Sequence, residues 1–227
     1  MSHELRTPLN SIIGFTGVML QGLTGQLTQE QTAQLLMVRR SGDRLLALIN
    51  DILDLSRIEA GRVAVKAAET DLAVVVRACV ETVRPLSTAR GLDISIETLP
   101  EDTALVTDEQ KLHQVLVNLL ANAVKFTDSG GVTICAEEVD GDRVAFEVRD
   151  TGVGIAPEDL AAIFDEFVQV HLDGGKPEGT GLGLAISRRL ADLLGGTLSA
   201  TSVVGEGSTF RLCIPRVYRA PGEEARC

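Results

Sequence analysis

The sequence lacks the features that mark several large classes of protein. Its longest purely apolar runs, such as LAVVV, have only a few residues, so no segment is long enough to span a bilayer. No signal peptide precedes the first motif. Lys and Arg (21) are outnumbered by Asp and Glu (32), and the net charge of −11 argues against nucleic acid or anionic lipid as the main partner. We therefore expect a cytoplasmic segment that contacts neither nucleic acid nor membrane.

Cysteine is sparse, and two common nucleotide-binding signatures are missing. The thiols at positions 79, 135, 213 and 227 form no CxxC pair and have no histidines at metal-ligand spacing. Such usage is typical of a reducing compartment and predicts three core thiols and one in the tail. The chain has neither GxxxxGK[ST] nor a serine/threonine-kinase signature. Its glycine-rich GTGLGLAIS also lacks the strand that precedes a dinucleotide fingerprint.

What is present divides into two parts. Residues 1 to about 60 read as helical throughout, with a turn in QGLTGQLTQE where Gly22 and Gly25 interrupt the pattern. The second helix, from about Thr28 to Ala60, carries an apolar stripe wider than a hairpin of two helices can cover. Such a stripe is buried most simply in a four-helix bundle made by two chains, so we expect a homodimer.

From about Asp71 strands and helices alternate. A helix over 72–89 leads to short strands and a helix that opens at TDEQ, where Thr107 and Gln110 form a predicted capping box. Two longer strands, a glycine-containing loop, a helix from about 181 to 194 and two closing strands follow. This order predicts an α+β sandwich with helices on one face of a mixed sheet. The expected division is a helical-hairpin domain at 1–62, a linker at 63–70, a sandwich domain at 71–217 and a flexible tail at 218–227.

The opening stretch, SHELRTPL, contains one of only three histidines in the chain. On a helix His3 points roughly 160° away from the apolar stripe, and Thr7 shares its face. An exposed imidazole next to the carboxylate of Glu4 suits a nucleophile whose second ring nitrogen is held by an acceptor. A solvated surface histidine is the alternative that this stretch alone leaves open.

The segment DEQKLHQVLVNLLANAVKF predicts a helix with one apolar and one polar face. Lys111, Gln114, Asn118, Asn122 and Lys125 form the polar stripe. Amide oxygens one turn apart can hold a hydrated Mg²⁺, and a lysine can bind phosphate. A merely solvated face is the alternative, but asparagine is a poor helix former, which favours a site.

Two glycine-rich stretches complete the candidate site. In RDTGVGI, Asp150 ends an apolar strand, and Gly152 and Gly154 let the backbone approach a ligand. The carboxylate can accept a hydrogen bond from an exocyclic amine such as that of adenine.

Between the two stretches, IFDEFVQVHLDGGKPEG is predicted to be a mobile lid. In the second stretch, backbone amides and a helix N-terminus can hold phosphate. That stretch comprises Gly179, Thr180, Gly181, Leu182 and Gly183.

These stretches together resemble a known family. SHELRTPL is similar to the phosphoacceptor box of sensor histidine kinases. NLLANAVKFT, DTGVGI, IFDEF and GTGLGLAIS resemble, in order, the N box, first glycine box, F box and second glycine box of their ATP-binding domain. The resemblance extends to Pro215. It implies a dimeric helical hairpin that carries the phosphorylated histidine, followed by a Bergerat-type α/β sandwich that binds Mg²⁺-ATP beneath a lid.

The resemblance also implies an activity and partners. The family uses ATP to phosphorylate its own histidine, here His3, and transfers the phosphoryl group to an aspartate of a response-regulator receiver domain. Some members also dephosphorylate the regulator. The sensor domain of the family lies upstream of the phosphoacceptor box, outside this chain, and many members are membrane-bound.

Roles for individual residues follow from the matched boxes. Glu4 resembles the general base that accepts the Nδ1 proton, and Thr7 occupies the position linked to dephosphorylation. Asn122 matches the Mg²⁺ ligand, with Asn118 beside it and Lys125 on phosphate. The remaining positions are Asp150 as the adenine reader, Lys176 near the γ-phosphate, and Ser208 and Thr209 as the hydroxyls that support the aspartate.

Two other functions compete with the kinase interpretation. Gyrase-type ATPases share this pocket but hydrolyse ATP with a glutamate one turn before the metal asparagine. That position is Asn118, which cannot act as a general base. The second rival is a non-catalytic scaffold that binds nucleotide or a receiver, and the presence of every box argues against it.

Overall fold

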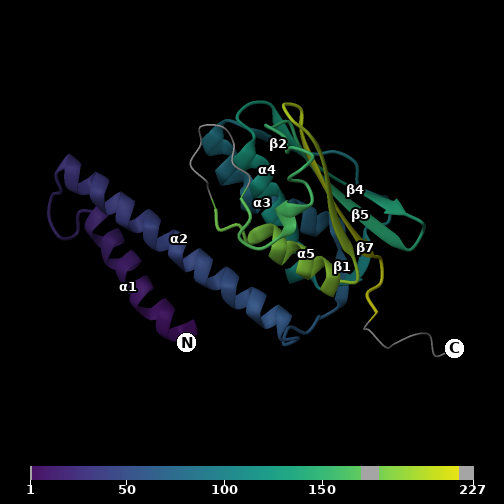
Figure 1. The fold of residues 1–227 in the computed structure, drawn as a ribbon, viewed down its shortest axis with the longest axis horizontal. Coiled ribbons are helices and arrows are strands. Elements are labelled where there is room, and N and C mark those ends of the chain that lie inside the picture. Colours follow the sequence, from purple (N-terminus) through teal and green to yellow (C-terminus); the bar gives the residue numbers. More distant parts are fainter. Residues whose placement is uncertain (1, 170–178, 220–227) are drawn as a thin grey trace.

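The computed structural model describes residues 2–169 and 179–219, with side chains from Arg6 onward. Figure 1 shows two long helices, α1 (Ser2–Leu20) and α2 (Gln29–Glu59), packed as a hairpin beside an α/β sandwich. Helix α2 is the longer of the two and lies between α1 and the sandwich. Within the described ranges, no helix has the length and hydropathy needed to cross a bilayer.

The hairpin follows from local sequence signals. Gly22 and Gly25, at φ +75° and +120°, adopt backbone conformations that favour glycine and so form the turn. Helix α2 then begins with a capping box, in which the Thr28 hydroxyl accepts from the Gln31 amide at 3.2 Å. The Gln31 side chain accepts from the Thr28 amide at 2.9 Å. The helix therefore begins close to the predicted residue.

The two helices approach each other closely at one point. A methyl group built on Gly42 of α2 would lie 3.0 Å from Cγ1 of Ile13 of α1. Leu9 of α1 is also buried at this contact between helices. Apolar residues of the predicted stripe on α2, including Val38 and Leu45, remain exposed at 47% and 49%. The hairpin thus covers only part of its own apolar surface, as the width of the stripe predicts.

The sandwich has a mixed sheet of five strands with helices on one face. Strand order is β2-β4-β5-β7-β6, with β2 and β4 parallel and the other neighbours antiparallel. Helices α3, α4 and α5 cover one face (Figure 1), so the predicted architecture is confirmed. The bounds are β2 (Asp93–Ile96), β4 (Gly131–Val139), β5 (Arg143–Asp150), β6 (Thr197–Val203), β7 (Gly207–Pro215), α3 (Leu72–Arg90), α4 (Glu109–Phe126) and α5 (Gly183–Leu193).

The core lies between this sheet and the helices. Helix α4 is central, because Leu112, Leu116, Leu119 and Leu120 are all inaccessible to solvent. Phe146 of β5, also at 0% exposure, is among the largest side chains that are wholly buried. Full burial of such side chains contributes about 1.5–3 kcal/mol each, so this layer is the main source of stability.

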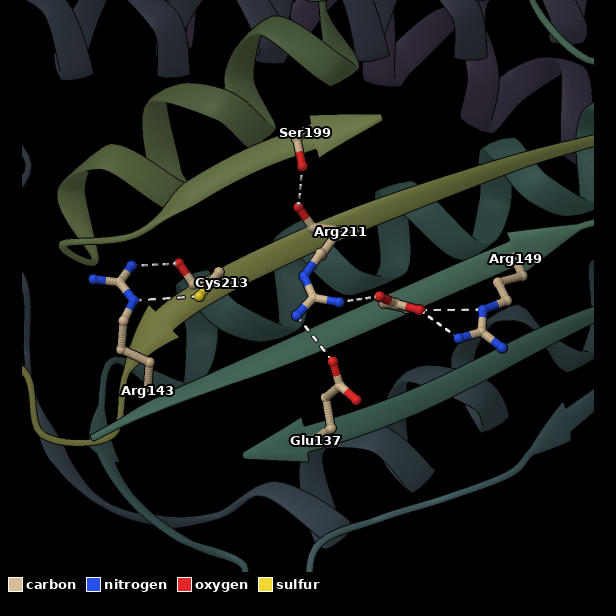
Figure 2. A network of polar contacts seen from close by, with 7 residues as sticks. Glu137, Arg143, Arg149, Ser199, Arg211 and Cys213 are labelled. Carbon is tan, nitrogen blue, oxygen red and sulfur yellow. Dashed lines mark hydrogen bonds and ion pairs between the residues drawn. The ribbon is translucent and has the colours of Figure 1, made fainter. Parts of the chain in front are cut away.

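The other face of the sheet is polar (Figure 2). Glu147 is buried on this face and accepts hydrogen bonds from Arg149 and Arg211. Arg211 also pairs with Glu137 at 2.9 Å. The hydrogen bond from Arg149, against the effect of burial and with the help of Arg211, lowers the pKa of Glu147. Ion pairs therefore cover this face, and the ligand chemistry belongs to the helical side.

Two of the predicted core thiols, Cys135 and Cys213, lie on the polar face instead, and Cys135 pairs there with Glu147. Cys79 and Cys135 are buried, but Cys213 is only partly buried and accepts a hydrogen bond from Nε of Arg143 at 3.2 Å. The prediction of a core position for these two thiols was wrong because strands β4 and β7 alternate their side chains between the two faces.

The linker is held by the N-terminus of α4. Strand β1 (Ala68–Asp71) pairs with β3 (Ala104–Thr107), and Thr107 is the last residue of this ladder. The N-cap is Asp108, which accepts from the Lys111 amide at 3.2 Å. The predicted capping box of Thr107 and Gln110 is therefore wrong by one residue, because Thr107 still belongs to the strand.

Asp108 has further partners in the linker. Its Oδ2 accepts from the Lys66 amide at 2.8 Å and from Nζ of Lys111 at 2.5 Å. Nζ of Lys111 also donates to the carbonyl of Ala64 at 3.0 Å. Burial opposes ionisation, but the ammonium of Lys111 and the two amides outweigh it and lower the pKa of Asp108. One carboxylate therefore joins the linker to α4.

Substitution of Asp108 by Ala should reduce the free energy of unfolding by about 2–4 kcal/mol, since it removes a helix cap and leaves buried donors without an acceptor. Urea denaturation at pH 7 measures this loss. Because the pKa of Asp108 is lowered in the folded chain, its stabilisation is present above the ordinary pKa of an aspartate and is lost as the pH falls through the folded value. The control is Asp71→Ala, which removes the exposed N-cap of α3. Equal losses in the two variants would contradict a special role for Asp108.

Candidate functional site

A cavity of about 730 Å³ lies on the helical side of the sandwich. Its walls come from α4, the end of β5, strand β7 and the segment 179–183 that leads into α5. A volume of this size is typical of sites for small molecules and cofactors. The polar lining residues are Asp51, Arg90, Asn118, Asn122, Lys125, Asp128, Asp150, Gln169, Thr180 and Ser208.

Helix α4 presents its asparagines to this cavity. Asn118 and Asn122 both line it, together with Lys125. Nδ2 of Asn118 donates to Oγ of Ser187 at 2.9 Å, which joins α4 to α5. A methyl group built on Gly183 would lie 2.6 Å from Oδ1 of Asn118, so a larger residue there would displace the Asn118 side chain. The part of the polar stripe from Asn118 to Lys125 is thus a wall of the cavity and not a solvated face.

The other predicted members of the stripe lie elsewhere. Lys111 is engaged with Asp108 at the start of the helix, and Gln114 is exposed. Neither residue lines the cavity. At the C-terminal end of α4, Nζ of Lys125 lies 4.5 Å above the ring of Phe126 and close to Gly179. A cation is therefore held beside the glycine-rich segment, where phosphate is expected.

Asp150 lies at the end of β5 with its carboxylate turned into the site. Oδ1 accepts from the amides of Gly152 at 2.9 Å and Ser208 at 3.3 Å. Burial raises the pKa of Asp150, and the two amide hydrogen bonds oppose that rise. A desolvated carboxylate at a cavity wall is a typical feature of a functional site.

The structure explains why glycines occupy positions 152 and 154. A methyl group on Gly152 would lie 2.2 Å from the carbonyl oxygen of Phe126, and one on Gly154 would lie 2.1 Å from that of Val203. Gly154 also has a φ of +70°. Gly154 lines the cavity, whereas Gly152 acts through its amide on Asp150. The backbone itself therefore forms this wall.

The second glycine-rich segment is held from two sides. The amide of Phe167 donates to the carbonyl of Gly181 at 3.0 Å, and a methyl group on Gly181 would lie 2.9 Å from the backbone of Phe167. Helix α5 then begins after Leu182 without a side-chain cap. Its first amides are available for an anionic ligand. The side chain of Leu182 is fully buried, so that residue contributes only backbone to the segment.

The hydroxyl beside Asp150 belongs to Ser208. Ser208 pairs with Asp150 in the register of β5 and β7, is buried and lines the cavity. Its hydroxyl lies 3.0 Å from Oγ of Ser202. Thr209 pairs with Arg149 and lies on the opposite face of the sheet. The expectation of a supporting hydroxyl from Thr209 was therefore wrong, whereas Ser208 lies on the cavity face, where its backbone amide donates to Asp150.

Several predicted residues lie apart from the cavity or outside the described part of the chain. His3, Glu4 and Thr7 lie in α1, and the side chains of His3 and Glu4 are outside the described residues. Thr7 is exposed. Lys176, and with it most of the predicted lid, also falls outside the described residues.

Asp51 of α2 and Arg90 of α3 were not predicted from the sequence as site residues. Both line the cavity. Arg90 donates to the carbonyl of Lys125 at 2.7 Å, at the last turn of α4. The sequence around Arg90 gave no indication of a ligand site, because the glycine that follows it indicates only the end of a helix. Asp51 lies on a helix of the hairpin, so only the contact between the two parts of the chain reveals its position.

The fold and the site define a nucleotide-binding domain attached to a helical hairpin. Residues 107–218 match the family described as "Histidine kinase-, DNA gyrase B-, and HSP90-like ATPase", which is an ATP-binding domain. Residues 1–61 match the "His Kinase A (phospho-acceptor) domain". The chain belongs to the sensor histidine kinase family, and the resemblance found in its sequence is confirmed.

Individual relatives agree with this assignment. The chain is 39% identical over 218 residues to the circadian input-output histidine kinase CikA of Synechococcus elongatus, which covers 95% of this chain and 29% of CikA. Among solved structures, full-length ShkA in complex with AMPPNP matches with a TM-score of 0.80 at 38% identity, over 97% of this chain and 45% of ShkA. ThkA in complex with the response regulator protein TrrA matches with a TM-score of 0.69 at 25% identity, over 98% of this chain and 60% of that one. The chain thus spans less than a third of CikA and less than half of ShkA.

Substitution of Asp150 by Asn should increase the free energy of unfolding and weaken ATP binding. Because the pKa of Asp150 is raised in the folded chain, ionisation at pH 7 destabilises the fold, and this cost disappears as the pH falls below the ordinary value. The amide keeps an oxygen for Gly152 and Ser208 but loses the charge that an adenine amine would meet, so the ATP dissociation constant should rise roughly 10- to 100-fold.

The matched control is Glu147→Gln on the same strand. The pKa of Glu147 is lowered by its arginine partners, so this substitution should reduce stability and leave ATP affinity unchanged. Urea denaturation and a nucleotide titration measure both quantities for each variant. The same sign of stability change in both variants would refute the electrostatic assignment.

Proposed function

We propose that this chain is the catalytic portion of a sensor histidine kinase that phosphorylates His3 from ATP and passes the phosphoryl group to an aspartate of a response-regulator receiver domain. The observation that carries the proposal is a single cavity that is lined by three kinds of group. These are the asparagine side chains of α4, the Asp150 carboxylate and the N-terminus of α5. The phosphoacceptor box lies on α1 of the same chain. The AMPPNP bound to ShkA supports ATP as the substrate, and the ThkA–TrrA complex supports a regulator as the partner.

The proposed nucleotide orientation follows from the chemistry of the walls. Asp150 accepts from the adenine amine, with Ser208 beside it. The phosphates lie toward the Lys125 ammonium and the segment 179–183, where the first amides of α5 can donate to them. Lys176, which is matched by the sequence alone, is proposed to meet the γ-phosphate. Thr180 lies on this segment too.

Magnesium would be held through oxygen ligands of this site. The described residues contain no group of three or more His, Cys, Asp and Glu side chains that could hold a metal ion. The amide oxygen of Asn122 at the cavity wall, together with phosphate oxygens and waters, fits the preference of Mg²⁺ for few protein ligands. When bound, the ion would neutralise phosphate charge. We propose Asn122 as its ligand and Asn118 as the residue that orients the helix wall through Ser187.

The proposed reaction is an in-line displacement. Nε2 of His3 attacks the γ-phosphorus of ATP, the bond to the bridging oxygen breaks, and ADP leaves with that bond's electron pair. Glu4 accepts the Nδ1 proton, so the ring remains neutral after the new P–N bond forms. The phosphoryl group then passes to a receiver aspartate. Thr7, which is exposed on α1, is proposed to orient a water that hydrolyses the aspartyl phosphate of the receiver to aspartate and inorganic phosphate.

The apolar surface of the hairpin is proposed as the dimer interface. Helix α1 exposes Ile12 and Phe15, and α2 exposes Val38, Leu45 and Ile52, each at 40% or more. Exposed apolar side chains in such number on both helices favour an interaction site, and a second copy of the hairpin would complete a four-helix bundle. We propose the domain limits as 1–62 for this hairpin and 71–217 for the ATP-binding domain, joined by 63–70 and followed by a tail at 218–227.

The residues of this site do not favour the alternative function, in which the protein simply hydrolyses ATP. An ATPase of the gyrase type needs a carboxylate general base one turn before the metal ligand. Asn118 occupies that position, and its amide is hydrogen-bonded to Ser187. A neutral amide cannot remove a proton from water.

His3→Gln tests the proposed function directly. The parent chain, incubated with γ-labelled ATP and Mg²⁺, should acquire a phosphate that is labile in acid and stable in base, and the variant should acquire none. Glutamine keeps a polar side chain of similar reach on the helix but has no nucleophilic ring nitrogen. ATP binding, measured by titration, should be unchanged in the variant, which shows that its ATP site is intact. Label that persists in His3→Gln would refute the assignment.

Glu4→Ala and Thr7→Ala should separate the two activities. Loss of a general base costs about 10²–10⁴-fold, so Glu4→Ala should reduce autophosphorylation by that factor. Thr7→Ala should retain most of the kinase rate and lose phosphatase activity. The first rate is measured with labelled ATP, and the second with a phosphorylated receiver that accepts phosphate from this chain. Equal losses of both activities in both variants would mean that the pair acts only on helix structure near Pro8.

A further inference from the structure

A hydrogen bond joins the hairpin to the second glycine-rich segment. Oγ1 of Thr180 donates to Oδ2 of Asp51 at 2.8 Å, across 129 positions of sequence. The same hydroxyl accepts from the amide of Leu182 at 3.2 Å. Thr180 therefore connects helix α2 to the turn that leads into α5. Asp51 also lines the nucleotide cavity, so the contact lies at its edge.

Asp51 is flanked on its own helix by two leucines that face the ATP-binding domain. Leu48 and Leu55, about one turn before and after it, pack against the core of the ATP-binding domain, and Leu55 is only 6% exposed. Burial raises the pKa of Asp51, the Thr180 hydroxyl opposes that rise, and Asp54 adds to it. The carboxylate is thus a polar group within an apolar docking face. A shift or rotation of the domain along α2 would leave it partly buried without its partner, which is costly.

The contact also lies level with the phosphoacceptor. Helices α1 and α2 are antiparallel, and Nε of Arg6 donates to Oδ1 of Asn50 at 3.0 Å. Asn50 is adjacent to Asp51, and Arg6 lies three residues from His3, which is about one helical turn or roughly 4.5 Å of rise. Since Asp51 lines the cavity, the edge of the cavity lies within about one helical turn of the level of His3 along the hairpin.

We propose that Asp51 is a positioning residue for autophosphorylation: through Thr180 it fixes the register at which the ATP-binding domain docks on α2, so that the phosphate end of the cavity is level with His3. The inference rests on the proposed kinase function. Asp51 takes no part in the chemical step and is not required for nucleotide affinity. Misplacement by about 1 Å can cost roughly 100-fold in rate, so a docking contact of this kind has a measurable effect.

The test compares Asp51→Ala with Asp51→Asn in the whole chain. Alanine removes the acceptor, whereas asparagine keeps an oxygen for the Thr180 hydroxyl. We expect Asp51→Ala to lower the autophosphorylation rate at saturating ATP by roughly tenfold or more, with the KM for ATP and the affinity for a fluorescent ATP analogue unchanged within about twofold. Asp51→Asn should retain most of the rate. Asp43→Ala, an exposed aspartate on the same helix, should behave as the parent.

A second measurement does not depend on catalysis. Hydrogen exchange of the amides in residues 179–183 should accelerate in Asp51→Ala and stay close to the parent in Asp51→Asn. If the parent takes no phosphate on His3, the proposed function fails, while the exchange result still decides whether the contact exists.

Three outcomes would overturn the inference. A faster rate in Asp51→Ala would show that the contact restrains the kinase. A parallel loss of ATP affinity would place Asp51 in the nucleotide site itself. Equal behaviour of Asp51→Ala and the parent, in both rate and exchange, would show that the hydrogen bond does not set the docking register.

Discussion

Helix α4 packs against the hydrophobic core on one side and lines the cavity on the other, and the rest of the ATP-binding domain depends on that constraint. One side places Leu116 and Leu120 in the core, where neither is accessible to solvent. The other side presents Asn118 and Asn122 to the cavity. A spacing of four residues keeps the two amides on one side, because the helix repeats every 3.6 residues. A rotation of α4 in the core would therefore move the ligand groups, so packing and site geometry cannot vary independently.

The glycines that lie against α4 are needed because the chain passes very close to this helix, and not because they make the chain flexible. Gly152 lies against the carbonyl of Phe126, and Gly183 lies against the side chain of Asn118. A methyl group at either position would come within 2.2 Å or 2.6 Å of those atoms. Where glycines line the cavity, the main chain forms the wall, which brings amide donors close to a ligand without side-chain entropy to lose.

Four carboxylates in this chain show that the hydrogen-bond partners of a buried carboxylate decide whether its pKa is raised or lowered. Asp108 and Glu147 have cationic partners, and their pKa values are lowered, so they stabilise the fold at neutral pH. Asp51 and Asp150 have only hydroxyl or amide donors, and burial raises their pKa values. The two stabilising groups lie away from the cavity and the two costly ones lie at it. Such a division is typical of proteins in which function and stability compete.

Local patterns in the sequence determined much of this protein. The turn at Gly22 and Gly25, the two-sided α4 and the sheet with helices on one face follow from periodicity and from the backbone freedom of glycine, which act within a few residues. Short boxes likewise identified Asn122 and Asp150 as parts of one site. Only the tertiary structure decided that Ser208 and not Thr209 faces Asp150, because a shift of one residue in strand register reverses the face. It alone placed Asp51 at the cavity, because that position depends on which surfaces of two domains meet, and no local periodicity records a contact between residues 129 apart.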